Sequence, residues 1–446
     1  STQPNTLFPY TTLFRSQLEP NPLPQGADPM VGDPGADPQA ELPFFPEEDP
    51  APVAEQDPGG RPVEPWGMDL DPRLDDVAIT DASARRFDLG PTGGESGALA
   101  QALIEAWIRQ DPTLLQGVLD GNHGSQAAQD QARLTGMFWQ AMVGRPEVAR
   151  EAWTSLMESG NATPAQMEML KAAIEFDAVP NVPEQAGRHD PLARSMRMVL
   201  LESAAGRYQD TAHYDDAARS LSELMNSEVH APWAPHREAL VSWAERLNTA
   251  QNNYRLSPRG DWPSITYRVE PNDSLELIRK RLVQDNPGLL LCTGLIAKVN
   301  QTGQYIHAGD VLRIPTEPSN MLVDLDARMA FYRHGNEIVR AWTVGIGKEG
   351  KDTPVGTYTI GDKLKEPVWT RRNKPALPYG HPENLLGARW LGWYQDGIKT
   401  DYGFHGTNDE SGVGDRVSSG CIRMRNLDVE ELFELLPQGA QVVVQP

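Results

Sequence analysis

The sequence predicts a multidomain α+β protein, and three changes of pattern along the chain support this fold class. Residues 17–95 are rich in proline and acidic residues, residues 96–255 repeat apolar positions with the period of a helix, and short alternating apolar runs dominate after residue 320. A chain of 446 residues also exceeds what one hydrophobic core normally organises. We therefore expect separate domains joined by linkers.

The amino-terminal part is expected to be a disordered linker. Residues 17–95 hold 18 Asp and Glu against 4 Lys and Arg, a net charge of −14 out of −22 for the chain, and 15 of its 38 prolines. Such a composition buries too little apolar surface to offset the entropy lost on ordering. Residues 1–16 include TLFPYTTLFRS, which resembles a translated sequencing adapter. We interpret them as an artefact that has replaced a signal peptide or membrane anchor, the alternative being a genuine short apolar segment.

Composition excludes several classes of function. Neutralising phosphates requires clustered Lys and Arg, and the sequence has no basic stripe, so nucleic acid is not an expected partner. The nine His and two Cys lack the spacing of a metal site, and two cysteines are too few for a disulfide framework. We interpret Cys292, which follows three leucines, as a buried small residue with nothing nearby to stabilise a thiolate.

Residues 96–255 are expected to form a helical domain. Apolar residues recur at helical spacing from Leu99 to Trp107 and again from Ala149 to Met157. Four pairs mark expected helix starts, namely Asp111-Pro112, Arg145-Pro146, Thr163-Pro164 and Asp190-Pro191. Stacked hairpins of a tetratricopeptide-like kind are the expected arrangement, without a clean repeat period. We interpret this domain as a spacer or as a docking site for a protein partner.

Residues 264–316 are expected to fold as a small module in the order strand, helix, helix, strand. After the first strand, Asp273 or Ser274 can cap the first helix. The YRV strand, the NDSL turn and the GDVLRIP ending resemble a LysM module, a family that binds the N-acetylglucosamine-containing glycan of peptidoglycan or chitin. Asn272 stands where that family usually has glycine, which weakens the expectation of glycan binding more than that of the fold.

Residues 320–446 are expected to form a mostly β domain that carries the chemistry. The segment FHGT contains His405, and SSGCIRMRN contains Cys421, 16 residues later. A thiol becomes a good nucleophile when an imidazole lowers its pKa and takes its proton. The N–H groups of Gly420 and Cys421 are candidates for holding an oxyanion, and Arg423 for binding a substrate carboxylate. Taken singly, a buried Cys and a hydrogen-bonded His are the commoner interpretations.

The conjunction of these segments favours the chemical interpretation. Together with TPVG, PVW and LGARWLG upstream, they resemble the signature of YkuD-type L,D-transpeptidases over most of residues 320–446. The resemblance implies a β-sandwich-like domain with Cys421 as nucleophile and His405 as its base. The partner that orients His405 stays open between a backbone carbonyl and Thr407. Ser419 stands where part of the family has a second histidine, so catalysis should not depend on an imidazole there.

The resemblance also assigns the remaining candidate residues of the site. Shaping of the site or of its oxyanion hole is implied for Gly420, Ser418, Ser419, Gly406 and Thr407, and substrate binding for Arg423, Asn426, Arg389 and Trp390. Trp369, Trp390 and Trp393 are candidates to line the substrate groove. Tryptophans of a β domain more often pack in the core, however, and this is the commoner interpretation of all three. His334 and His381 match no position of the signature and are expected to be structural.

The implied reaction acts on peptidoglycan stem peptides. The cysteine attacks the amide of the diamino acid at the third stem position, D-alanine leaves, and a thioester remains. Carbapenems are expected to acylate the same thiol. A neighbouring stem amine, a protein amine or water then resolves it, giving a crosslink, protein attachment or L,D-carboxypeptidase activity. No cofactor is needed, and a periplasmic or cell-envelope location is expected. The alternatives are a non-catalytic wall-binding scaffold and a papain-like peptidase, in which Cys would precede His.

Overall fold

The computed structural model describes residues 95–176, 182–183, 190–228, 237–258, 260–303, 305–370 and 375–446. All of them belong to one compact unit, Met68–Pro446. The expectations for residues 1–16 and for nearly all of residues 17–95 fall outside the described part. Within that part, no helix has the length and apolar character needed to cross a bilayer.

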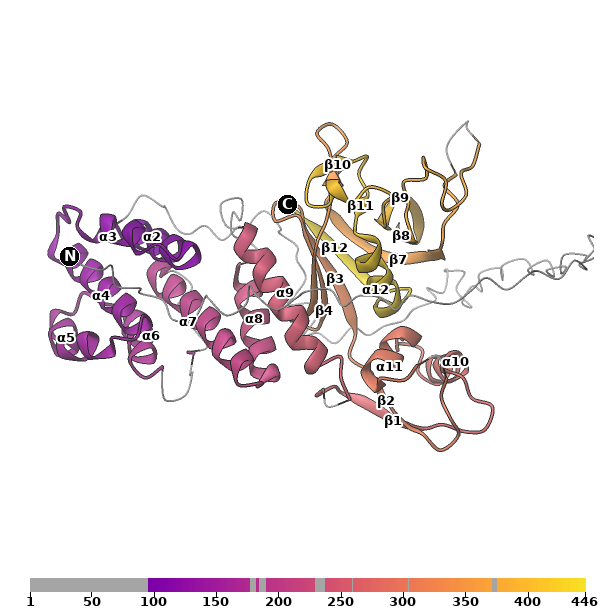
Figure 1. The fold of residues 1–446 in the computed structure, drawn as a ribbon, viewed down its shortest axis with the longest axis horizontal. Coiled ribbons are helices and arrows are strands. Elements are labelled where there is room, and N and C mark those ends of the chain that lie inside the picture. Colours follow the sequence, from indigo (N-terminus) through magenta and orange to yellow (C-terminus); the bar gives the residue numbers. More distant parts are fainter. Residues whose placement is uncertain are drawn as a thin grey trace, which may run out of the picture. The chain divides into compact units, whose positions relative to one another are not determined.

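The helical domain runs from α2 to α9 (Figure 1). Its helices are α2 (Glu95–Arg109), α3 (Pro112–Leu119), α4 (Gln126–Met142), α5 (Pro146–Ser159), α6 (Pro164–Ile174), α7 (Pro191–Asp210), α8 (Tyr214–Glu228) and α9 (Arg237–Asn253). The four predicted helix starts are confirmed, because α3, α5, α6 and α7 each begin at the proline. Proline suits this position because its missing N–H would have no helical partner there.

The predicted apolar faces of the helices are largely buried. Leu99, Leu103 and Ala149 lie in the core of the helical domain. Met157 is 57% exposed, so its predicted place on the apolar face of α5 is wrong. Leu156, predicted on the same face, is buried as expected.

The small module contains the expected order of elements. Strand β1 (Ser264–Arg268) pairs antiparallel with β2 (Val311–Pro315), and helices α10 (Leu275–Asp285) and α11 (Thr293–Asn300) lie between them in the chain. Ser274 caps α10 by accepting from the Leu277 N–H at 3.2 Å. Asn272 has a φ of +71°, which explains how it can replace glycine, since Asn visits the left-handed region more easily than most residues. The LysM-like identity of the module stays a prediction.

The carboxy-terminal domain is built on one eight-stranded sheet, in the order β11-β9-β8-β7-β12-β3-β4-β5. Its strands are β3 (Ser319–Asp324), β4 (Met329–His334), β5 (Glu337–Thr343), β7 (Gly356–Lys365), β8 (Arg389–Gln395), β9 (Ile398–His405), β11 (Ile422–Arg423) and β12 (Gln441–Gln445). A short parallel pair joins β6 (Ile346–Gly347) to β10 (Arg416–Ser418). Helix α12 (Asn426–Leu435) follows β11 (Figure 1).

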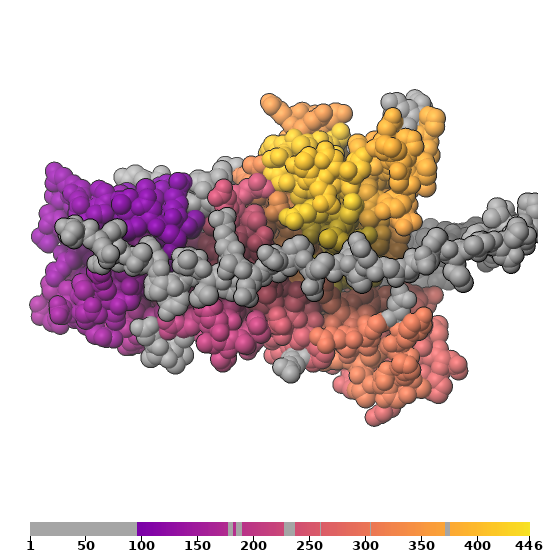
Figure 2. Space-filling view, in the orientation of Figure 1, coloured from indigo at the N-terminus to yellow at the C-terminus, as the bar shows by residue number. Residues whose placement is uncertain are grey.

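The sheet curls until its two ends meet. Gly345, just beyond the edge strand β5, exchanges both backbone hydrogen bonds with Arg423 of the opposite edge strand β11, at 2.7 and 2.8 Å. The domain expected to be β-sandwich-like is thus built on one curled sheet, which closes along this seam around a shared core. The space-filling view shows the yellow carboxy-terminal residues directly against the orange residues of the preceding strands (Figure 2).

The two faces of the sheet differ in what covers them. Trp393, Phe404 and Ile422 lie in one core cluster with Val429 and Leu432 of α12. Because side chains alternate along a strand, the neighbours of these residues point to the other face. That other face carries the residues of interest for chemistry.

The edge strand β5 is covered by side chains of the helical domain. Asn248 of α9 accepts from the Ala341 N–H at 3.0 Å and donates to the Ala341 carbonyl at 2.8 Å, as a neighbouring strand would. Ser222 accepts from the Ile338 N–H at 2.8 Å, and Gln251 donates to the Ile338 carbonyl at 3.0 Å. An uncovered edge would offer free backbone groups to other chains. The helical domain thus completes the β domain.

Cys292 lies where the small module meets the β domain. It is half-buried, and the Lys363 ammonium lies 3.5 Å from its sulfur, so the expectation that no nearby group would stabilise a thiolate is wrong. Lys363 is nevertheless committed to the carbonyls of Phe433 and Leu436, at 2.6 and 2.7 Å. Burial outweighs the lysine and raises the pKa of the Cys292 thiol.

Candidate active site

The loop before β11 is shaped by one hydroxyl group and one glycine. Ser418 donates from its hydroxyl to the Cys421 carbonyl at 2.7 Å and accepts from the Gly420 N–H at 3.1 Å. Gly420 has a φ of +114°, and a Cβ there would lie 2.6 Å from the ring of Tyr402. Only glycine fits this position without strain. The hydroxyl and the glycine together fix the backbone that presents Cys421.

Strand register brings Cys421 beside His405. In the parallel pair of β9 and β11, Phe404 lies opposite Ile422 and His405 lies opposite Arg423. Phe404 and Ile422 face the core, so His405, Arg423 and Cys421 share the other face. Extending this register by one residue pairs Cys421 with Gly403. Gly403 precedes His405 by two residues, so Cys421 and His405 are diagonal neighbours on the same face.

Cys421 is a half-buried thiol in its resting state. Its sulfur lies 3.6 Å from the Asp401 carbonyl, to which the thiol can donate. Burial and the nearby Asp401 carboxylate raise its pKa to about 11, against the lowering effects of a Gly403 backbone hydrogen bond and the Arg423 guanidinium. The expectation that His405 would hold the thiol pKa down is wrong for this state. In the part of the chain that the structure describes, no hydrogen bond joins the side chains of Cys421 and His405.

His405 is buried, neutral and oriented by the backbone. Its Nδ1 lies 2.6 Å from the Gly406 carbonyl, which accepts only if Nδ1 carries the proton, leaving Nε2 as the basic nitrogen. Burial lowers the pKa of His405 to about 4. Of the two partners that the sequence left open, the structure has the carbonyl, because the Thr407 hydroxyl donates to Asp409 instead, at 2.9 Å.

Trp390 and Arg389 point to opposite faces of β8. Trp390 lies opposite His405 in the sheet and stacks on it, with ring centroids 6.2 Å apart and planes 23° apart. Arg389 turns instead toward α12, where its guanidinium lies 3.4 Å from the Glu430 carboxylate and over the Phe433 ring. The structure therefore places Trp390 at the candidate site, whereas Arg389 lies on the opposite face of the sheet, against α12.

Asn426 fixes the turn that follows His405. Its side-chain oxygen accepts from the N–H groups of Ala388 at 2.9 Å and Thr407 at 3.3 Å, and its amide donates to the Thr407 carbonyl at 2.7 Å. A Cβ on Gly406 would lie 2.2 Å from that oxygen, which explains the glycine. These contacts hold backbone, so the geometry gives Asn426 a positioning role.

Arg423 and Ser419 complete the predicted residues. Arg423 is half-buried beside His405, and its Nε is buried without a hydrogen-bond partner among the described residues. Burial lowers its pKa, and the nearby Asp409 carboxylate opposes this only in part. A carboxylate of a ligand would satisfy it. Ser419 is exposed at the tip of the loop.

Sequence reasoning missed two residues of this face. The Gly403 backbone is hydrogen-bonded to the Cys421 thiol, and Asp401, two residues earlier in β9, has its carbonyl 3.6 Å from the sulfur. No strand was predicted before His405, so the sequence carried no signal that would have placed either residue beside the thiol.

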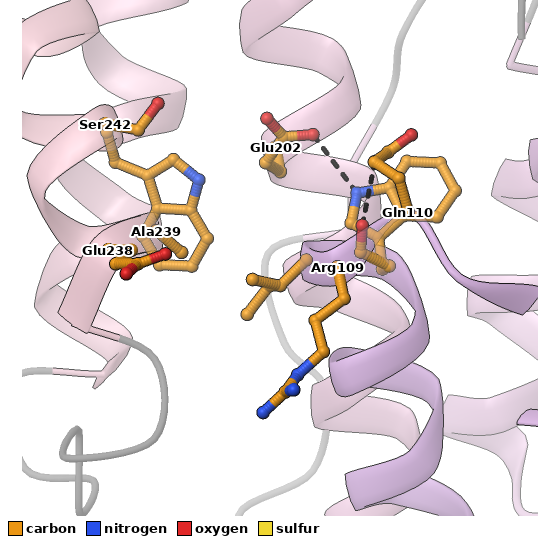
Figure 3. Close-up of a pocket in the computed structure, with 9 residues that line it drawn as sticks. Arg109, Gln110, Glu202, Glu238, Ala239 and Ser242 are labelled. Atoms are coloured by element: carbon orange, nitrogen blue, oxygen red, sulfur yellow. Dashed lines mark hydrogen bonds between the residues drawn. The ribbon is translucent and has the colours of Figure 1, made fainter. Parts of the chain in front are cut away.

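A second feature of interest is a cavity of about 770 Å³ in the helical domain, between α2, α7 and α9 (Figure 3). Trp107 donates there to Glu202 at 3.1 Å, and Glu202 also pairs with Arg246. The lining has no cysteine or histidine, so the chemistry predicted from the sequence does not belong there.

Comparison with known proteins identifies the β domain. A family model described as the L,D-transpeptidase catalytic domain, YkuD, matches residues 318–444. YkuD of Bacillus licheniformis, named as an L,D-transpeptidase, is 32% identical over 195 residues, covering 41% of this chain and 99% of that protein. YqjB of Bacillus subtilis, also named as an L,D-transpeptidase, is 40% identical over 112 residues, covering 24% of this chain and 61% of that protein.

The catalytic domain from the E. faecium L,D-transpeptidase acylated by ertapenem is similar at 24% identity and a TM-score of 0.24, over 29% of this chain and 97% of that chain. The match to Bacillus licheniformis YkuD spans nearly the whole of that protein at more than 30% identity. The chain therefore belongs to the YkuD family of L,D-transpeptidases.

Proposed function

We propose that the protein is a peptidoglycan L,D-transpeptidase that uses Cys421 as nucleophile and His405 as general base. The observation that carries the proposal is the shared face of β9 and β11, which sets a half-buried thiol beside a neutral imidazole whose Nε2 is basic. Membership of the L,D-transpeptidase family supports the reaction class. The arrangement argues against a scaffold, because binding alone would need neither group.

The first half-reaction forms a thioester. The thiol turns from the Asp401 carbonyl toward His405, whose Nε2 takes the proton as the sulfur attacks the carbonyl of the stem diamino acid. The Gly420 N–H already donates to Ser418, so we assign the oxyanion to the Cys421 N–H. His405 then gives its proton to the leaving nitrogen, and D-alanine departs.

The second half-reaction consumes the thioester. An amine attacks the same carbonyl, His405 removes its proton, and the thiolate leaves and is reprotonated. A stem amine gives a crosslink, a protein amine gives attachment, and water in the same position gives L,D-carboxypeptidase activity. Arg423 is proposed to hold the carboxylate of the leaving D-alanine, since its buried Nε needs an acceptor.

The small module is proposed to bind peptidoglycan glycan. The match to Bacillus licheniformis YkuD covers 41% of this chain, whereas residues 318–446 are 129 residues, 29% of it, so the similarity extends upstream into residues of the module. We expect the full chain to pellet with purified peptidoglycan, and its Cys421→Ala variant to pellet equally, because glycan binding does not use the thiol. An unretained full chain in this co-sedimentation assay would contradict the role.

Two broader proposals concern the location of the enzyme and the role of its helical domain. An enzyme of peptidoglycan acts in the periplasm or cell envelope, and we propose this location. The helical domain, which completes the edge of β5, is also proposed to dock a protein partner.

The product profile of the purified protein tests the proposed function. Incubation with muropeptides that carry tetrapeptide stems should release D-alanine and yield dimers crosslinked between diamino acids. Tripeptide products without dimers would show that water is the acceptor. A protein that leaves the tetrapeptides intact, while remaining folded, would contradict the enzymatic proposal.

A further inference from the structure

The active face of β9 carries a charge that the mechanism above does not use. Gly403 and His405 share this face, Cys421 lies beside Gly403, and Asp401, two residues before Gly403, has its backbone carbonyl against the Cys421 sulfur. The thiol is therefore flanked by His405 on one side along the strand and by Asp401 on the other. The contact of the Cys421 sulfur with the Asp401 carbonyl, at 3.6 Å, brings the backbone of this second neighbour against the thiol.

The two flanks of the thiol have opposite charge. Arg423 lies beside His405, and its half-buried guanidinium marks the cationic flank. Asp401 is exposed and has no ion pair within the described stretches, so its carboxylate is available to a ligand. It is also near enough to Cys421 to oppose formation of the thiolate. A substrate bound across the sulfur would meet a cation at one end and an anion at the other.

The order of the reaction decides which part of the substrate meets which flank. The incoming amine must take the place of the leaving D-alanine nitrogen, so leaving group and acceptor share the Arg423 flank. The acyl half of the donor extends the other way. Its diamino acid bears a side-chain ammonium on a flexible stem, long enough to reach beyond the thioester.

We propose that the Asp401 carboxylate binds the free side-chain ammonium of the donor diamino acid, and so selects stems that carry this amine. The inference rests on the proposed transpeptidase function and makes Asp401 a specificity-determining residue of the acylation step. No covalent chemistry is required of it. An exposed ion pair of this kind changes affinity by about two- to fivefold, which sets the size of the expected preference.

A double-mutant cycle between protein and substrate tests the proposal. The substrates are a tetrapeptide stem with a free side-chain amine and the same stem with that amine acetylated. Single-turnover D-alanine release from each is measured with the full chain, with Asp401→Asn and with Asp401→Glu. Single turnover reports acylation alone, so the acceptor does not enter. Asp396→Asn is the matched control, since it removes the same charge in the turn between β8 and β9.

We expect the unaltered protein to prefer the free amine by about two- to fivefold, Asp401→Asn to lose the preference, and Asp401→Glu to restore part of it. Asp396→Asn should behave as the unaltered protein does. Equal preference in the unaltered protein and Asp401→Asn, or no preference in either, would overturn the role of Asp401 while leaving the enzyme intact. Absence of D-alanine release from both stems would instead overturn the proposed function and this inference with it.

Discussion

Replacing Cys421 with alanine is expected to abolish D-alanine release from tetrapeptide muropeptides, down to the background without protein. The reason is chemical, because the methyl group cannot form the thioester that both half-reactions share. The same variant should lose acylation by a carbapenem, whose strained amide is attacked in the same way. Intact-protein mass spectrometry should show one adduct on the unaltered chain, mapped to the Cys421 peptide, and none on the variant.

Cys292→Ala is the matched control for this prediction, because Cys292 is the other cysteine of the chain and is also half-buried. Its Lys363 neighbour is committed to two carbonyl groups, and burial raises the pKa of its thiol. We expect this variant to keep both D-alanine release and the adduct. Turnover that survives in Cys421→Ala, or an adduct that maps to Cys292, would exclude the proposed nucleophile.

The sequence predicted what depends on local chemistry. Proline at a first helical position has one favourable conformation, so the starts of α3, α5, α6 and α7 were readable without tertiary information. The strand, helix, helix, strand order of the small module followed from turn residues such as Asp273 and Ser274 in the same way. His405 and Cys421 were found because their segments resemble a known signature, and the register of β9 and β11 brings them together.

Features that depend on distant contacts were not readable. The bridge between Gly345 and Arg423 closes the sheet. It joins the backbones of two residues far apart in the sequence, and no local sequence pattern indicates that they pair. The approach of Lys363 to Cys292 likewise joins two domains. Asn426 was assigned to substrate by resemblance, whereas its three backbone contacts are visible only once the turn after His405 is folded.

The closed seam also explains why the active face can be both rigid and partly open. Arg423 is held from one side by the parallel register with His405 and from the other by Gly345. Cys421 immediately precedes this doubly held strand, so its backbone position is fixed by two neighbours although its side chain stays half-exposed. A site built on paired strands holds its geometry better than one on a free loop.

The resting protonation states make a specific demand on the mechanism. Burial lowers the pKa of His405 to about 4 and raises that of Cys421 to about 11, so near neutral pH both groups are uncharged. A preformed thiolate and imidazolium pair is therefore not the resting state. Proton transfer must accompany attack, and His405 can accept the proton at any pH above its own pKa. Activity should fall only as acid protonates His405, when pH drops toward about 4.

His405→Ala is expected to slow carbapenem acylation by about 10² or more, the lower range for a lost acid–base group. Without the base, only the small thiolate fraction reacts, so the rate should rise about tenfold per pH unit below the Cys421 pKa of about 11. The unaltered protein should instead be nearly flat between about pH 5 and pH 8. His307→Ala, which removes an exposed imidazole from the small module, is the control and should match it. Parallel pH profiles for His405→Ala and the unaltered protein would show that His405 does not take the thiol proton.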